Sequence, residues 1–234
     1  TSTKKASIST WRIGSVQPIP SNGNRLQRHY PRPLMATRIH LVRHAEVDNP
    51  RHLVYADLPG YDLSPTGRDQ ARAAARYLGR RPVVAVWSSP LLRALRTAEV
   101  IANRLDLSVR VEEALTEWEL MNRWRGVSWE DLPVRFPGEL EAFLSTPGDL
   151  PFSPESLEEM TRRVTATIRG LDDLYPHGEL VVVTHQAPVQ AAILGLSGTP
   201  LSSFWDGRPG HASVTTLKGG PGWGVETAWE PEQG

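Results

Sequence analysis

The sequence of 234 residues contains no cysteine, only three lysines and no long apolar run. The absence of cysteine excludes disulfides, thiolate nucleophiles and cysteine-ligated zinc or iron–sulfur sites. No segment reaches the roughly 18 apolar residues that a membrane-spanning helix requires, and the N-terminus lacks the apolar segment of a secretory signal. We therefore expect a cytoplasmic protein that does not bind membranes.

Acidic residues are absent from residues 1–37, which hold six of the 26 basic residues. Since all 26 acidic residues lie in the rest of the chain, residues 38–234 carry a net charge of −6. A domain of this charge is not expected to bind nucleic acid, because phosphate backbones require a basic face. It can still bind a phosphate group in one local basic pocket.

Residues 1–37 show no hydrophobic period and are rich in Ser, Thr, Pro, Asn and Arg. We expect a loose N-terminal extension or a tag, because Met35 lies just before the first strand-like run. A targeting segment without acidic residues is the alternative. One folded domain is predicted for residues 38–234, a length sufficient for a substantial core.

Beyond residue 37, short apolar runs alternate with segments of helical periodicity. Helices are expected to begin at three Ser-Pro pairs, since a capping hydroxyl followed by proline is typical of a helix start. The alternation predicts an α/β fold with three layers, a mainly parallel sheet with helices on both faces. The expected strands cover 37–43, 82–87, 108–111, 179–184, 212–217 and 225–229, and the Ser-Pro pairs begin at Ser64, Ser89 and Ser153.

Three of the predicted strands are followed at once by polar side chains. Arg43 and His44 follow the first, Ser89 and Arg93 follow the second, and His185 follows the strand 179–184. In open α/β sheets, ligands bind beyond the carboxyl ends of the strands. Two histidines and two arginines are therefore expected to meet at one edge of the sheet.

Such a set of side chains suits a phosphate monoester. Arginine forks hold the phosphate oxygens, one histidine attacks phosphorus, and the other stabilises the developing charge. A carboxylic acid is needed on the far side to protonate the leaving alkoxide. Neither a metal nor a cofactor is expected, and the sequence has no phosphate-binding G-x-x-x-x-G-K loop and no G-x-S-x-G elbow.

Four segments resemble the histidine phosphatase superfamily, the fold of cofactor-dependent phosphoglycerate mutases and of many small-molecule phosphatases. They are residues 41–46, 58–71, 88–98 and 182–185, and the likeness extends from about residue 38 to 217. The family usually has Arg-His-Gly where this chain has Arg43-His44-Ala45. Alanine should be tolerated there unless the backbone requires a positive φ.

The resemblance implies a role for each candidate site residue. His44 corresponds to the phosphate acceptor, and Arg43, Arg93 and His185 correspond to the phosphate pocket. Leu115-Thr116-Glu117 fits the pattern around the proton donor, which makes Glu117 the first candidate and Glu119 its rival. Asn49 lies near a position where the family often has a phosphate-contacting Asn, and the segment 211–215 resembles a late strand that often begins with Asn.

The sequence thus predicts a metal-independent phosphomonoester hydrolase that acts on a small phosphorylated metabolite through a phosphohistidine at His44. Mutases of the family usually carry a long insertion between the acid and the second histidine, whereas Glu117 and His185 are only 68 positions apart. A phosphoglycerate-type mutase and a non-catalytic phosphate-binding scaffold are the alternatives. The substrate and the oligomeric state, including whether the protein is a homodimer, stay open.

Overall fold

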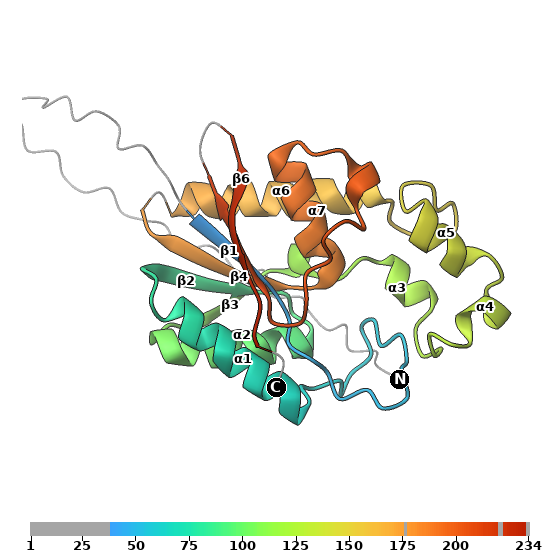
Figure 1. Ribbon diagram of the computed structural model, residues 1–234, viewed down its shortest axis with the longest axis horizontal. Helices are drawn as coiled ribbons and strands as arrows, with labels where there is room; N and C mark the ends of the chain where they lie inside the picture. The colour runs from blue at the N-terminus through green and yellow to red at the C-terminus, as the bar shows by residue number, and fades with distance from the viewer. Residues whose placement is uncertain (1–37, 176, 220–221, 233–234) are drawn as a thin grey trace, which may run out of the picture. The chain divides into compact units, whose positions relative to one another are not determined.

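The computed structural model describes residues 38–175, 177–219 and 222–232, so the predictions for residues 1–37 lie outside the described residues. A six-stranded sheet forms the centre of the domain, with the strand order β3-β2-β4-β1-β5-β6 (Figure 1). The predicted α/β class is confirmed. The strands are β1 (Arg38–Arg43), β2 (Val83–Ser88), β3 (Val109–Val111), β4 (Glu179–Thr184), β5 (Val214–Lys218) and β6 (Gly224–Trp229).

The pairing of the strands brings the predicted site residues to one edge. β4 pairs in parallel with β1 on one side and with β2 on the other, and β5 is antiparallel to β1. Arg43 is the register partner of Thr184, and Ser88 is that of Val183. The carboxyl ends of β1, β4 and β2, which are adjacent in the sheet, therefore lie at nearly the same level.

Helices cover both faces of the sheet, with α1 and α2 on one side and α6 and α7 on the other (Figure 1). β4 is buried along its whole length, as expected for a parallel strand covered on both faces. Its side chains alternate between two hydrophobic cores. Leu180 and Val182 belong to one core, and Val181 and Val183 belong to the other. The helices are α1 (Pro65–Leu78), α2 (Leu92–Leu105), α3 (Leu120–Arg123), α4 (Leu132–Arg135), α5 (Glu139–Ser145), α6 (Leu157–Leu174) and α7 (Gln186–Ser197), with short 3₁₀ turns at Glu113–Leu115 and Leu201–Ser203.

Only one of the three predicted Ser-Pro helix caps is confirmed. The Ser64 hydroxyl accepts a hydrogen bond from the Gly67 N–H at 2.9 Å and caps α1. The other two predictions were wrong: α2 begins at Leu92, and α6 is capped by Ser156, which forms a capping box with Glu159. This box satisfies two free N–H groups of the helix start at once. Among the described helices, none is long and apolar enough to cross a membrane.

Gly67 is expected to be essential for the packing of α1 under the loop that follows β1. A Cβ atom at this position would lie 2.0 Å from the carbonyl oxygen of Glu46, two residues after His44. Gly67→Ala should therefore lower the free energy of unfolding by about 2–3 kcal/mol, as overpacking does, in denaturant titrations. Gly170→Ala in α6 is the matched control, because nothing lies within 4 Å of its Cβ position, and it should stabilise slightly. Equal effects of the two would contradict the packing argument.

Candidate active site

His44 lies at the carboxyl end of β1 and is only 2 % exposed. Its backbone N–H donates to the Thr184 carbonyl of β4 at 2.8 Å. Its Nδ1 is 2.8 Å from the Ala45 carbonyl oxygen, and because a carbonyl can only accept, Nδ1 carries the proton. The neutral ring therefore has its lone pair on Nε2.

The surroundings of His44 favour this neutral ring. Burial lowers its pKa well below the usual value, and the positive charges of Arg93 and Arg43 and the neighbouring ring of His185 lower it further. An unprotonated imidazole is the form that can attack phosphorus. His44 is thus in the state that a nucleophile needs.

Ala45 replaces the glycine expected after His44 without backbone strain, because it is not among the residues with positive φ. Its N–H donates to the Thr97 hydroxyl at 3.0 Å. That hydroxyl donates in turn to the Arg93 carbonyl oxygen at 2.8 Å. The loop that carries His44 is therefore tied to the first turn of α2.

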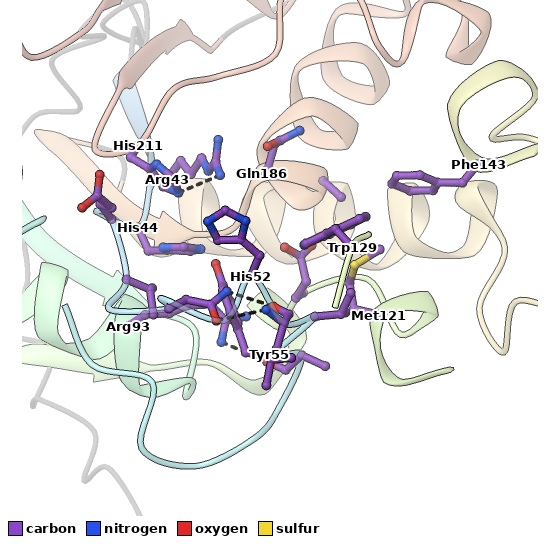
Figure 2. Close-up of a pocket in the computed structure, with 18 of the residues that line it drawn as sticks. Arg43, His44, His52, Tyr55, Arg93, Met121, Trp129, Phe143, Gln186 and His211 are labelled. Atoms are coloured by element: carbon purple, nitrogen blue, oxygen red, sulfur yellow. Dashed lines mark hydrogen bonds between the residues drawn. The ribbon is translucent and has the colours of Figure 1, made fainter. Parts of the chain in front are cut away.

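Arg43 is held on one side of His44 by two hydrogen bonds. Its Nη1 donates to the Pro209 carbonyl at 2.9 Å, and its Nη2 donates to Nε2 of His211 at 2.8 Å (Figure 2). Its buried Nε has no hydrogen-bond partner among the described residues. The guanidinium is fixed in orientation and keeps a donor for an anion.

Arg93 is held in a similar way by the loop before α1. Its Nη1 donates to the Ala56 carbonyl at 2.9 Å, and its guanidinium carbon lies 4.7 Å from the ring centre of Tyr55. Its buried Nε also finds no partner within the described part of the chain. Burial lowers the pKa of both guanidinium groups, but arginine starts so high that both remain cationic.

His185 is fully buried beside His44, with the ring centres 5.2 Å apart. Its Nε2 is 2.7 Å from the Ser89 hydroxyl, so Ser89 positions the ring of His185 and is not the cap of α2. Burial, followed by the charges of Arg93 and Arg43, lowers its pKa well below the usual value. A phosphate dianion at the site would raise this pKa again, because an opposite charge favours the protonated ring.

Glu117 lines the cavity that His44, Arg43 and Arg93 also line, whereas Glu119 does not. Glu117 is half-buried and accepts a hydrogen bond from the Trp118 N–H at 2.9 Å. Burial raises its pKa, against the opposing effects of the Trp118 N–H, Arg93 and Arg43. Glu119 is exposed at the start of α3. Of the two candidates, only Glu117 is placed to exchange a proton with a bound ester.

Asn49 also lines the cavity, but its amide is used within its own loop. Its Nδ2 donates to the Leu53 carbonyl at 2.9 Å, and its Oδ1 accepts from the Leu53 N–H at 3.1 Å. The amide keeps one more N–H for a ligand. Asn49 therefore shapes the rim of the pocket, and a phosphate contact by it stays a prediction.

His211 is a member of the site that the sequence did not identify. It lines the cavity, its ring centre lies 5.6 Å from that of His44, and it accepts the hydrogen bond from Arg43. Burial and the charge of Arg43 lower its pKa to about 4. The only signal for it was its place at the start of the segment 211–215.

Of the candidate site residues described so far, all but the fully buried His185 and the exposed Glu119 line a cavity of about 320 Å³ (Figure 2). Arg43, His44, Arg93 and His211 lie at one end, and Trp129, Met121 and Phe143 lie at the other. Within the described ranges, no group of three or more His, Asp or Glu side chains is arranged to hold a metal ion. The donors at the first end suit an anion.

The chain is similar to known proteins over most of its length. The family model of the histidine phosphatase superfamily (branch 1) matches residues 39–230. The chain is 32 % identical over 179 residues to phosphoserine phosphatase 1 of Hydrogenobacter thermophilus, which covers 76 % of this chain and 84 % of that one. It is 30 % identical over 201 residues to a glucosyl-3-phosphoglycerate phosphatase of Mycobacterium tuberculosis, with 80 % and 87 % covered.

The same similarity is seen among solved structures. The native structure of the mycobacterial glucosyl-3-phosphoglycerate phosphatase superposes with a TM-score of 0.75 at 28 % sequence identity. The match covers 84 % of this chain and 100 % of that one.

Proposed function

This chain belongs to branch 1 of the histidine phosphatase superfamily and is a phosphatase of small phosphorylated metabolites, and we propose that it works through a phosphohistidine on Nε2 of His44. The observation that carries the proposal is the hydrogen bond from Nδ1 of His44 to the Ala45 carbonyl. It leaves Nε2 unprotonated between two arginines that each keep a free Nε donor.

In the first step, Nε2 of His44 attacks phosphorus and the bond from phosphorus to the ester oxygen breaks. Glu117 gives its proton to the leaving oxygen, so the alcohol departs uncharged. Arg43 and Arg93 stabilise the charge on the equatorial oxygens, as does His185 when protonated. The raised pKa of Glu117 helps it to hold this proton before the ester binds.

In the second step, water attacks the phosphohistidine and the bond from phosphorus to nitrogen breaks. The Glu117 carboxylate now takes a proton from the attacking water, which reverses its first role. Inorganic phosphate leaves, and His44 returns to the neutral ring with its proton on Nδ1. None of these steps requires a metal ion, and metal independence is part of the proposal.

Trapping the intermediate tests this proposal. Enzyme mixed with a radiolabelled phosphate ester and rapidly denatured in alkali should carry a phosphoryl group that is stable to base, labile to acid and located on His44 by mass spectrometry. A scaffold would give no labelled protein, and a mutase would depend on a bisphosphorylated primer. Either result would overturn the proposed hydrolysis.

Glu117→Gln should slow esters according to their leaving groups. An alkyl phosphate needs a proton on its leaving oxygen, so its kcat should fall by about 10²–10³-fold. The kcat for p-nitrophenyl phosphate should fall far less, since p-nitrophenolate leaves without a proton. Glu119→Gln is the matched control and should change neither rate. Equal slowing of both esters by Glu117→Gln, or a stronger effect of Glu119→Gln, would contradict the assignment.

The pH profile should show activity well into the acid range. Since the pKa of His44 is lowered, the reactive neutral ring is present above that pKa and is lost only as the pH falls through it. As the pH falls to about 4, His211 is protonated and can no longer accept the hydrogen bond from Arg43, which lowers activity further. The acid limb of kcat/KM against pH should therefore lie below 6.5, the ordinary pKa of histidine, whereas loss of the Glu117 proton accounts for the fall on the alkaline side. An acid limb centred at or above 6.5 would contradict a neutral buried His44.

A further inference from the structure

The end of the cavity away from His44 has an aromatic wall, which we define as Trp129, Phe143 and Trp205. Met121 lies beside Trp129 (Figure 2). Nothing in the reaction at His44 requires these side chains. They are therefore available to contact the part of the ester that leaves as the alcohol.

The aromatic wall is rigid because it rests on other rings. Phe143 lies 4.7 Å from Trp205 and 5.3 Å from the buried Trp124, measured between ring centres. The indole N–H of Trp205 donates to the Phe143 carbonyl at 2.8 Å, so Trp205 offers its ring and not this donor. A wall of this kind favours a flat or apolar group.

The charges of the cavity point the same way. Its cationic side chains are Arg43 and Arg93, and both lie at the phosphate end. Two carboxylates, Glu46 and Glu117, also line it, and the Nδ1 of a third lining residue, His52, is 3.0 Å from the Glu130 carboxylate. A second anionic group on the ester would meet no further arginine or lysine among the lining residues, and His52 already has Glu130 as its partner. An unpaired charge is costly to bury.

We infer that the aromatic wall is a leaving-group subsite for an uncharged aromatic or apolar alcohol, and that esters with a carboxylate on the alcohol are disfavoured. The inference rests on the proposed function, since it concerns the same site. It sets this chain apart from a phosphatase that acts on phosphoserine, whose alcohol carries a carboxylate. Arg208, which does not line the cavity, is exposed, and its guanidinium carbon lies 4.4 Å from the ring centre of Trp205.

Three alkyl phosphates test the subsite without a difference in leaving-group chemistry, because each needs a proton from Glu117. They are 2-phenylethyl phosphate, ethyl phosphate and O-phosphoserine. We expect kcat/KM for 2-phenylethyl phosphate to exceed that for ethyl phosphate by about 10–100-fold, the usual discrimination of an apolar pocket. O-phosphoserine should be the poorest of the three.

Substitutions in the aromatic wall show whether its side chains contact the alcohol group of the ester or only support the fold. Trp129→Ala should reduce the ratio of kcat/KM between 2-phenylethyl and ethyl phosphate by about tenfold. Trp229→Ala is the matched control, because Trp229 is half-buried and stacks on Tyr77 outside the cavity. It should leave the ratio unchanged. Met121→Lys adds the missing cation and should raise kcat/KM for O-phosphoserine relative to ethyl phosphate.

The outcomes distinguish the two proposals. If a phosphohistidine forms on His44 but O-phosphoserine is the best ester, the subsite is wrong and the mechanism stands. Loss of that preference in Arg208→Ala would then assign the carboxylate to Arg208. If none of the esters yields a phosphohistidine, the mechanism fails first. An unchanged ratio in folded Trp129→Ala would also overturn the subsite.

Discussion

His44→Ala is expected to lower kcat by about 10⁴-fold or more, the loss seen when a covalent nucleophile is removed. The substitution removes the only atom in this scheme that forms a bond to phosphorus in the first step, Nε2. Arg43, Arg93 and Glu117 would still bind an ester and water, so a weak residual rate is compatible with the scheme. Single-turnover kinetics with a radiolabelled ester measure both the rate and the loss of labelled protein.

The control for His44→Ala is His177→Ala, which removes an exposed histidine near the opposite ends of the strands, just before β4. It should keep both the rate and the label. The assignment would be refuted if His44→Ala were still labelled, or if the label of the wild-type enzyme were found on a different histidine. His211 and His185 are the two rings close enough to His44 to be checked.

Arg93→Ala should lower kcat/KM by about 10²–10³-fold, the typical cost of removing one charge-stabilising donor. Arg93 is buried and lines the same cavity as His44, and its Nε has no hydrogen-bond partner among the described residues. The inhibition constant of inorganic phosphate should rise as well, because the product presents the same oxygens. Arg93→Lys should recover only part of the loss, since an ammonium cannot contact Ala56 and two phosphate oxygens with one planar fork.

Arg96→Ala is the matched control for Arg93→Ala, because it removes an exposed arginine from the same helix. Arg96 pairs with Glu99 at the surface, and such pairs contribute little. Thermal unfolding of all three variants shows whether the fold is kept. If folded Arg93→Ala binds phosphate as tightly as the wild type, Arg93 is not part of the phosphate site.

The sheet and the phosphate end of the site could be predicted because both depend on short-range patterns. The run at 179–184 is apolar at its four central positions, which predicts a central strand, and His185 follows it directly. The rule that ligands bind beyond the carboxyl ends of strands then brings His185 to His44. No knowledge of the loops was needed for this part.

The acid was ambiguous because local conformation decides between two glutamates two residues apart. The backbone is extended at Thr116 (φ −62°, ψ 161°) and helical at Glu119 (φ −61°, ψ −20°). In an extended segment, Glu117 and Glu119 would face the same side. The turn into α3 separates them, so Glu117 faces the cavity and Glu119 faces solvent.

The aromatic wall could not be predicted for a different reason. Trp129, Phe143 and Trp205 come from three segments whose apolar residues follow no regular period. Phe143 lies on a helix of seven residues, and Trp205 follows a 3₁₀ turn far along the chain. Their meeting depends on how loops pack against the sheet, which composition and periodicity do not encode.

The hydrogen bond between Nδ1 of His44 and the Ala45 carbonyl also fixes the regiochemistry of the covalent intermediate. A phosphorylated imidazole exists as two isomers, with the phosphoryl group on the nitrogen nearer to or farther from the side-chain branch. Because the nearer nitrogen is occupied by its proton, only the τ-isomer can form. The two isomers differ in their phosphorus NMR spectra, so a backbone carbonyl, which takes no part in the chemistry itself, leaves a spectroscopic mark on its product.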